Sequence, residues 1–225
     1  KNGRHHAMAF ADGGELVDRL QETGDSPTGA GGEPRTGTTV RFWPDPSIFD
    51  DITFLAATLT ERFQMMAFLN AGLRITFRDE RPDHSGEPVE FHYEGGIRDF
   101  VRHVNAAKEA LFTDVGYFRQ DESDDDGSME VEVAFQWNTG YNSDGLHSFA
   151  NGISTIEGGM HEEGFKKSLT NTVNRYAREH GFLKDKESNL QGEDIREGLT
   201  AIISVKLTDP QFEGQTKAKL GNVPM

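Results

Sequence analysis

The chain of 225 residues contains no cysteine, which excludes disulfide bonds and thiolate metal sites. The absence of cysteine fits a reducing compartment, so we expect a cytoplasmic protein. No apolar run approaches the roughly 18 residues that a membrane span needs, and we expect no membrane partner. With 35% hydrophobic and 27% charged residues, the composition is typical of a folded globular chain of one large domain or two small ones.

Positive charge is also scarce, because 23 Lys and Arg residues face 38 Asp and Glu residues and leave a formal net charge of −15. This balance argues against a surface that is generally suited to coating DNA. Any contact with nucleic acid must therefore be local.

Several catalytic motifs are missing. The stretch "GEPRTGTT" has Gly32 and Gly37 at P-loop spacing, but Thr38 stands where the phosphate-binding lysine is required. The acidic run "ESDDDG" begins like a calcium loop, yet its twelfth position is Val133 instead of glutamate. "HEEGF" ends in Phe165 and so fails the HExxH pattern, and no G-x-S-x-G elbow occurs. A metal-dependent or serine hydrolase is therefore the weakest functional hypothesis, and no metal ligands are assigned.

The first part of the chain predicts short strands around one long helix. Residues 11–37 are rich in Gly, Pro, Asp and Thr and predict a mobile connection, with a short helical turn near Leu16–Leu20. The expected elements are strands at 4–10 and 38–45, the second with Val40 and Phe42 on one face, a helix at 46–70 with Leu55, Leu59, Phe63 and Met66 on its apolar stripe, and a hairpin of strands 73–80 and 89–93.

The second part predicts a mixed sheet crossed by a long helix. Residues 129–137, "MEVEVAFQW", alternate most clearly, and we expect a strand near "LHSFANGI" to pair with them across the turn at 138–145. A strand after a long helix permits a crossover unit. The other expected elements are a helix from Ile97 to Val104, a strand at 116–120, an acidic turn at 121–128, a helix at 162–180, a strand at 199–207 and a loop after it.

The helix at 162–180 has an apolar stripe of Phe165, Leu169, Val173 and Tyr176. Lys167, Arg175 and Arg178 lie on the opposite face. Polar helix faces are usually only solvated, but in a chain this acidic three cations on one face favour a surface for a phosphate backbone.

The stretch "QFEGQTKAKLGN", residues 211–222, follows an apolar strand and presents Gln215, Thr216 and Lys217 together. Most loop lysines have no specific role, and the spacing alone does not assign one here. A phosphate group would nevertheless account for this combination of side chains.

Seven long stretches, in this order, resemble the B subunit of bacterial DNA gyrase, with actinobacterial forms the most similar. The related topoisomerase IV subunit shares much of the pattern. The stretches are "RTGTTVRFWPDPSIF", "MAFLNAGLRITFRDE", "FHYEGGIRDFV", "VEVAFQWN", "FANGISTIEGGMHEEGFKKSL", "EDIREGLTAIISVKL" and "DPQFEGQTKAKLGN".

The resemblance implies an α+β fold in two parts. Residues 1–96 would form the C-terminal part of a GHKL ATP-binding domain, a layered sandwich. Residues 97–225 would form the transducer domain, which is similar to ribosomal protein S5 domain 2 and would be incomplete at its C-terminus. The chain would then be a fragment of a longer protein.

The resemblance also implies roles for particular residues. Thr38 would hold the adenine of ATP, and Gly37 and Val40 would flank that pocket, which aminocoumarin inhibitors also use. Gln215 and Lys217 match the family's QTK loop, which reaches the γ-phosphate of ATP. Loss of this contact on hydrolysis would move one domain against the other.

Lys166 matches a basic residue that faces the DNA cavity in the family. With Lys167, Arg175 and Arg178 it would form the DNA-facing surface for double-stranded DNA. The implied protein partners are the gyrase A subunit, in an A2B2 heterotetramer, and a second B subunit in an ATP-dependent clamp dimer.

The residues that the family uses to bind Mg²⁺, to activate water and to close the lid lie upstream of the matching region. We therefore expect this fragment alone not to hydrolyse ATP. The chain also has Met160 where relatives carry a threonine in "EGGTH". A topoisomerase IV subunit and a non-catalytic, transducer-like interaction module remain the alternatives.

Overall fold

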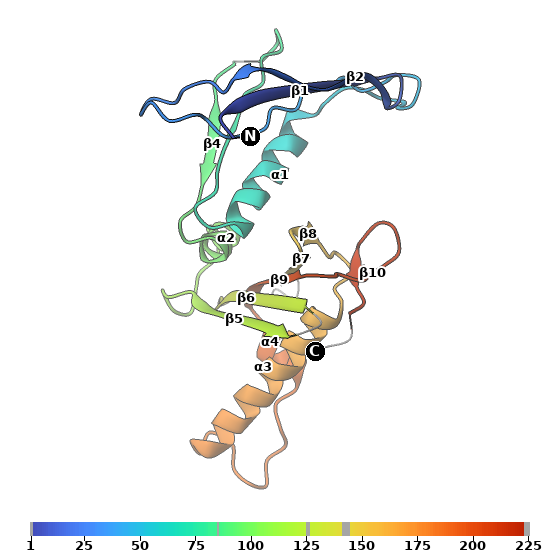
Figure 1. The fold of residues 1–225 in the computed structure, drawn as a ribbon. Helices are drawn as coiled ribbons and strands as arrows, with labels where there is room; N and C mark the ends of the chain where they lie inside the picture. The colour runs from blue at the N-terminus through green and yellow to red at the C-terminus, as the bar shows by residue number, and fades with distance from the viewer. Residues whose placement is uncertain (1, 85, 125–126, 141–144, 223–225) are drawn as a thin grey trace. The chain divides into compact units, whose positions relative to one another are not determined.

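A computed structural model describes residues 2–222, apart from 85, 125–126 and 141–144. The chain divides into two compact units, Lys1–Leu55 and Ala56–Met225. Its helices and strands are shown in Figure 1. Within the described residues, no helix combines the length and the apolar character needed to cross a bilayer.

The first unit contains a long hairpin of β1 (Arg4–Ala11) and β2 (Glu15–Asp25), which pair antiparallel. The strand expected at 4–10 is confirmed. The helical turn expected near Leu16–Leu20 is wrong, because the chain reverses tightly at Asp12–Gly14 and returns along β1. The signal lay in the Asp-Gly pair at residues 12–13, where both φ angles are positive (47° and 77°), as tight hairpin turns require. Of the connection expected at 11–37, residues 15–25 are therefore a strand, whereas residues 26–37 form no helix or strand.

The strand expected at 38–45 is also wrong. These residues form no regular secondary structure, and Val40 and Phe42 are exposed. A strand needs a neighbour that accepts and donates backbone hydrogen bonds, and no strand among the described residues pairs with this segment.

Helix α1 (Ala56–Leu69) starts ten residues later than expected. Upstream, the Asp45 carboxylate accepts hydrogen bonds from the backbone and hydroxyl of Ser47, and Asp51 accepts one from the Thr53 backbone. These local turns compete with the helix for the backbone donors. The buried face differs from the expected stripe, since Leu55 and Met66 are exposed while Ala67, Phe68 and Leu69 are buried.

The next elements agree with the sequence. Strands β3 (Arg74–Phe77) and β4 (Val89–His92) form the expected antiparallel hairpin. Helix α2 (Ile97–Val104) buries Ile97, Phe100 and Val101, as its apolar spacing predicts.

A mixed sheet of five strands forms the centre of the second unit, in the order β5-β6-β9-β7-β8. The parallel pairing of β7 with β9 confirms the crossover. The expected pairing of residues 129–137 with the strand near 146 is wrong, because β9 lies between them and pairs with both. The strands are β5 (Gly116–Asp124), β6 (Gly127–Trp137), β7 (Leu146–Ala150), β8 (Ile153–Ser154) and β9 (Leu199–Leu207).

The acidic turn expected at 121–128 is shorter than predicted. Residues 121–124 continue β5 and pair with the start of β6, while residues 125–126 lie outside the described residues. Arg119 on β5 and Lys206 on β9 neutralise part of the negative charge of this strand pair by pairing with Glu130 on β6. Arg119 pairs with Glu130 at 2.7 Å, and Lys206 pairs with the other oxygen of Glu130 at 2.7 Å.

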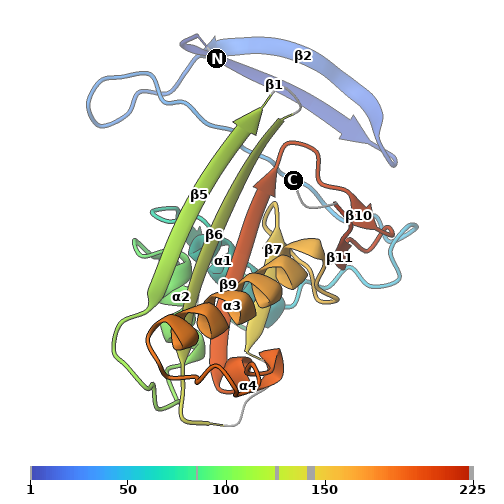
Figure 2. The ribbon, with the colours of Figure 1, turned by 90° about the horizontal axis from the view of Figure 1, so that it is seen from below.

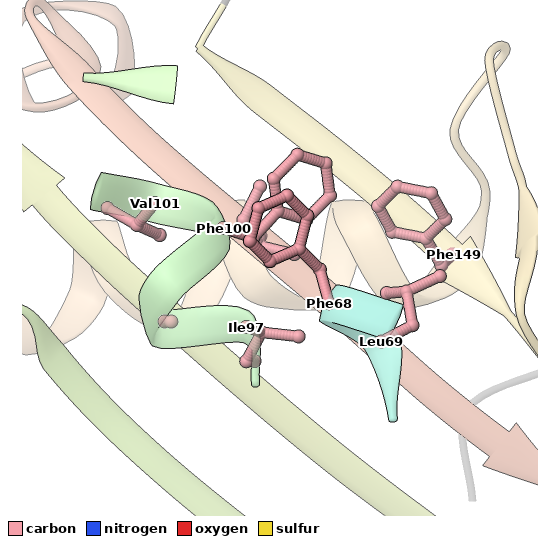
Figure 3. Close-up of a cluster of buried hydrophobic side chains, with 8 residues drawn as sticks. Phe68, Leu69, Ile97, Phe100, Val101 and Phe149 are labelled. Carbon is pink, nitrogen blue, oxygen red and sulfur yellow. The ribbon is translucent and has the colours of Figure 1, made fainter. Parts of the chain in front are cut away.

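Helices cover both faces of this sheet, with α3 (Met160–Glu179) and the short α4 (Gly192–Arg196) on one side and α1 and α2 on the other (Figure 2). Strand β9 is therefore buried along its length except at Lys206, like other doubly covered strands. On the α2 side, the rings of Phe68 and Phe100 stack with centroids 4.9 Å apart and pack with Phe149 and Ile202 (Figure 3). This core fixes the sheet against which α3 is positioned.

Candidate functional site

The segment expected to be a loop after β9 is a small hairpin. Strands β10 (Phe212–Glu213) and β11 (Lys219–Leu220) pair antiparallel, and Gln215, Thr216 and Lys217 lie at the tip. All three side chains are exposed, whereas Ala218 and Leu220 in the returning strand are buried. The hairpin thus presents the QTK residues to solvent on a buried stem.

Lys217 adopts a backbone conformation that is uncommon for a lysine. Its φ angle is 56°, in the left-handed region, and its backbone N–H points to the carbonyl of Gly214 at 3.4 Å. Such a conformation costs about 1–2 kcal/mol for a residue with a β-carbon. Strain of this kind is concentrated at functional sites, where it directs a side chain.

The Lys217 ammonium is also available for a ligand. It lies 5.9 Å from the centre of the Phe212 ring, and within the described part of the chain it forms no ion pair. The neighbouring cation differs, because Lys219 pairs with Glu213 at 3.1 Å. An unpaired ammonium at the tip of a fixed turn is suited to bind an anion.

The base of the hairpin is closed by one side chain. Asn222 accepts a hydrogen bond from the Gln211 backbone at 2.6 Å and donates one to the Asp209 carbonyl at 3.1 Å. The Gly221 backbone donates to the Gln211 carbonyl at 2.7 Å. The tip is therefore mounted on a defined support.

The returning strand is also tied to the loop that precedes α3. The Glu157 backbone donates to the Ala218 carbonyl at 2.9 Å, and Leu220 donates to the Gly158 carbonyl at 3.1 Å. Gly159, the N-cap of α3, forms an isolated parallel bridge with Leu220. This contact was not predicted from the sequence, although the "EGG" before the helix is a signal for a close backbone approach.

The start of α3 is held by a buried polar network. The Ser148 hydroxyl donates to Glu162 at 2.8 Å and lies 2.8 Å from the Thr155 hydroxyl, which in turn lies 3.1 Å from His161 Nε2. Burial lowers the pKa of His161, although the charge of Glu162 partly offsets this. His161 is therefore neutral near physiological pH and serves the packing of this helix turn.

Lys166 is engaged with two carboxylates. Its ammonium lies 2.8 Å from Glu162 and 2.9 Å from Glu163. Burial would lower the pKa of Lys166, but its hydrogen bonds to these carboxylates raise it above the usual value. The Glu–Lys spacing of four and three residues was readable in the sequence as a helix-surface pair.

The other three cations of α3 fall into two groups. Lys167 and Arg175 are exposed and form no ion pair or hydrogen bond with described residues. Arg178 is half-buried and donates to the carbonyls of Lys184 and Glu187, at 3.1 and 2.8 Å. The expected apolar stripe of this helix is right for Phe165, Leu169 and Val173, but Tyr176 is exposed and stacks on His180 at 3.8 Å.

The residues expected at the adenine lie in the other unit. Gly37, Thr38 and Val40 are exposed and belong to the extended segment without regular structure.

The part of the chain that the structure describes contains no group of three or more His, Asp or Glu side chains that could hold a metal ion.

Comparison with known proteins shows a consistent relationship. A family model described as DNA gyrase B matches residues 96–224. The chain is 47% identical over 256 residues to the DNA gyrase B protein of Micrococcus luteus, covering 99% of this chain and 34% of that protein. It is 52% identical over 202 residues to the Streptomyces coelicolor gyrase B protein, covering 83% of this chain and 29% of that protein. The chain thus spans about a third of the length of the curated relatives that it matches.

Solved structures agree with this relationship. The 43K ATPase domain of Thermus thermophilus gyrase B, in complex with an aminocoumarin, has a TM-score of 0.79 and 35% identity, covering 99% of this chain and 56% of that one. The topoisomerase IV ATP-binding domain of Francisella tularensis has a TM-score of 0.75 and 28% identity, with 99% and 56% coverage. The expected α+β fold, the end of a GHKL ATPase sandwich followed by a transducer domain, is confirmed. The chain belongs to the DNA gyrase B family.

Proposed function

We propose that this chain is part of the ATPase subunit of DNA gyrase, a type II topoisomerase that uses ATP to drive strand passage and negative supercoiling. Family membership and the similarity to a gyrase B ATPase domain support this proposal. The observation that carries it is the exposed, unpaired ammonium of Lys217 on a strained turn at the tip of a supported hairpin.

In this proposal, Lys217 and Gln215 contact the γ-phosphate of ATP. The ammonium places positive charge where negative charge shifts during phosphoryl transfer, and the Gln215 amide can donate a hydrogen bond to a phosphate oxygen. When the γ-phosphate leaves, the loop loses this contact. The hairpin would then report the state of the nucleotide to the rest of the second unit.

The adenine would be held by the other unit. Thr38 offers a hydroxyl that can bond to the base directly or through water, and Gly37 and Val40 would flank the pocket. The related Thermus thermophilus domain was solved in complex with an aminocoumarin. This supports the proposal that aminocoumarins bind the adenine pocket of the parent protein.

Magnesium is the expected metal of the parent reaction, but its ligand would lie outside this chain. The described residues contain no group of three or more His, Asp or Glu side chains that could hold it. The fragment alone is proposed to lack ATP hydrolysis, because the general base and the lid also lie outside the matching region.

The proposed partners follow from the same assignment. They are the gyrase A subunit in an A2B2 heterotetramer, a second B subunit in an ATP-dependent clamp, and double-stranded DNA, all in the cytoplasm. Lys167 and Arg175 are exposed on α3 and suited to phosphate contacts. Lys166 and Arg178 complete the proposed DNA-facing set, although both engage other groups of the chain.

We also propose a functional boundary between residues 96 and 97. The family match begins at residue 96, which supports a transducer domain at 97–225 after the end of the ATP-binding domain at 1–96. The compact units divide instead after Leu55. This difference arises because Phe68 and Leu69 of α1 pack into the same core as α2 and the sheet.

A topoisomerase IV subunit is the second candidate, favoured by the structural similarity to the Francisella tularensis domain. The two differ in outcome, since only a gyrase introduces negative supercoils. A non-catalytic, transducer-like interaction module is the third, and it would bind a partner without any dependence on nucleotide.

The test uses the parent subunit reconstituted with its A partner. In Lys217→Ala, we expect ATP turnover and ATP-dependent supercoiling to collapse while the protein stays folded. Lys219→Ala is the matched control. It removes the same charge two residues further along the hairpin, and the ammonium that it removes is already paired with Glu213. Equal activities of Lys217→Ala and Lys219→Ala would overturn the proposed contact.

A further inference from the structure

The hairpin that carries Lys217 and the helix that carries Lys166 meet at one backbone joint. We define this joint as residues 157–159 together with residues 218–220. Two hydrogen bonds cross it, from Glu157 to the Ala218 carbonyl at 2.9 Å and from Leu220 to the Gly158 carbonyl at 3.1 Å. Both ends of the joint are therefore fixed by backbone atoms, which hold position better than flexible side chains.

The backbones of Gly159 and Leu220 approach too closely to leave space for a side chain at residue 159. A β-carbon on Gly159 would lie 2.4 Å from the Leu220 carbonyl oxygen and 2.7 Å from its nitrogen, and the φ angle of 142° is unfavourable for other residues. The Gly159 carbonyl also accepts the first hydrogen bond of α3, from the Glu163 backbone at 3.0 Å. One residue thus touches the returning strand of the hairpin and starts the helix.

The first turns of α3 connect this joint to Lys166 through Glu162. Glu162 receives the hydroxyl of Ser148 from β7 at 2.8 Å and pairs with Lys166 at 2.8 Å. The Gly158 backbone donates to the Thr155 carbonyl at 2.8 Å, in the same network. A shift of Leu220 would therefore move the N-cap of α3, and with it the first turns of the helix, which carry Lys166 and the two carboxylates that it contacts.

We propose that the joint of residues 157–159 with 218–220 couples nucleotide at the QTK loop to DNA at the start of α3. This inference rests on the proposed function, because it takes Lys217 as the phosphate contact and Lys166 as DNA-facing. The coupling acts in both directions, since an effector that changes the affinity for a second ligand has its own affinity changed by the same factor.

Three glycines of this region give a graded test. Gly164, on the same helix, has no atom within 4 Å of the position that a β-carbon would take, so Gly164→Ala leaves the joint intact. In Gly158→Ala the new methyl would meet only the flexible carboxylate of Glu162, at 3.1 Å, on a backbone with φ of 73°. Gly159→Ala would push directly against the Leu220 backbone. Uncoupling is expected to increase from Gly164→Ala to Gly158→Ala to Gly159→Ala.

The measurement is the affinity of the parent complex for a non-hydrolysable ATP analogue, with and without duplex DNA. We expect DNA to change this affinity about fivefold or more in the unaltered protein and in Gly164→Ala, and to have no effect in Gly159→Ala. If Gly159→Ala does not fold, Gly158→Ala decides, with an expected reduction of the DNA effect. An unaltered protein without any DNA effect, or a folded joint variant that retains the full effect, overturns the proposal.

Failure of the proposed function gives a different pattern. If Lys217→Ala binds the analogue as tightly as the unaltered protein, Lys217 does not contact the phosphate, whatever the result of the glycine variants. If Lys217→Ala weakens binding while Gly159→Ala keeps the full DNA effect, the phosphate contact stands and only the joint is wrong. Hydrogen exchange of the chain itself adds a structural readout, with faster exchange expected in both 211–220 and 160–166 for Gly159→Ala alone.

Discussion

The guanidinium of Arg178 donates two hydrogen bonds to the side-chain oxygen of Asn189, at 3.0 Å from Nε and 2.7 Å from Nη2. It also donates to the carbonyls of Lys184 and Glu187. Most of its donors therefore hold the loop after α3 against the helix. A cation engaged in this way differs from Arg175, three residues earlier, which makes no such contact within the described residues.

This difference predicts that replacing Arg178 destabilises the chain far more than replacing Arg175. Arg178→Ala removes four hydrogen bonds from a charged donor group and should lower the free energy of unfolding by about 2 kcal/mol. Arg175→Ala should change it by less than about 0.5 kcal/mol. Urea unfolding of the chain measures both. Equal losses would show that Arg178 does not hold the loop.

The left-handed turn at Lys217 predicts that function and stability conflict at this position. With φ at 56°, Lys217→Gly should stabilise the chain by about 1 kcal/mol relative to Lys217→Ala, because glycine has no penalty in this region. In the strand position Lys219, the same comparison should reverse its sign, since glycine weakens a strand. Thermal unfolding of the four variants is the measurement. A Lys217→Gly variant no more stable than Lys217→Ala would mean that the turn is relaxed.

Local patterns in the sequence predicted those elements that bury a face against a neighbour close in the chain. The apolar spacing of α2, the alternation of β6 and the short apolar run of β9 each gave a correct element, because each pattern matches the faces that the element buries. The partner of a strand is a non-local property. Nothing in residues 146–150 indicates that β9, about fifty residues later, inserts between them and β6. The hairpin β1–β2 was missed for a different reason, since its strands are mostly exposed and carry no apolar alternation.

The candidate site was predictable only where a motif carried it. Gln215 and Lys217 were identified from the resemblance, but their mounting was not, because backbone contacts between residues 157–159 and 218–220 leave no side-chain pattern apart from two glycines. The partners of Lys166 could have been identified from spacing, as Glu162 and Glu163 lie four and three residues before it.

A buried polar cluster around Asn105 predicts a large loss of stability. Asn105 donates to Gln136 at 2.9 Å and accepts from the Thr200 hydroxyl at 2.7 Å and from Asn138 at 3.2 Å. Asn105→Ala would leave the Gln136 side-chain oxygen without its donor and would remove one of the partners of Asn138 and of Thr200, which should cost about 3 kcal/mol. Asn171→Ala, at an exposed position of α3, is the control and should have almost no effect. A similarly small loss for Asn105→Ala in urea unfolding would contradict the role of the cluster.

Tyr117 predicts a loss of stability at alkaline pH. Its hydroxyl donates to Glu132 at 2.7 Å, and burial together with this hydrogen bond raises the pKa of Tyr117 to about 12 from 10.0. The folded chain thus holds the proton more tightly than the unfolded chain. This contribution is complete below pH 10 and is lost as the pH rises to about 12. In a spectrophotometric phenolate titration, Tyr117→Phe should remove the highest transition, and removal of a lower one would contradict the assignment.

The two carboxylates beside Lys166 predict that removing one of them strengthens DNA binding. Glu162 and Glu163 offset the positive charge of Lys166, so this turn of α3 attracts phosphate less than Lys166 and the exposed Lys167 would alone. Glu163 is the exposed member of the pair, and its side chain has 66% exposure. Glu163→Gln should therefore raise the affinity of the chain for duplex DNA by about threefold at low salt, within the range of surface ion pairs.

The control for this prediction is Glu179→Gln, which removes the same charge at the far end of α3, where Glu179 forms no ion pair with described residues. Fluorescence anisotropy of a labelled duplex, repeated at increasing salt, measures both variants. The advantage of Glu163→Gln should fade as salt screens the charges. It should also disappear when Lys166→Ala is added, because the gain comes from the Lys166 ammonium, which Glu163→Gln leaves paired with Glu162 alone. An equal gain from both glutamine variants would attribute the effect to net charge alone and contradict a specific role for Glu163.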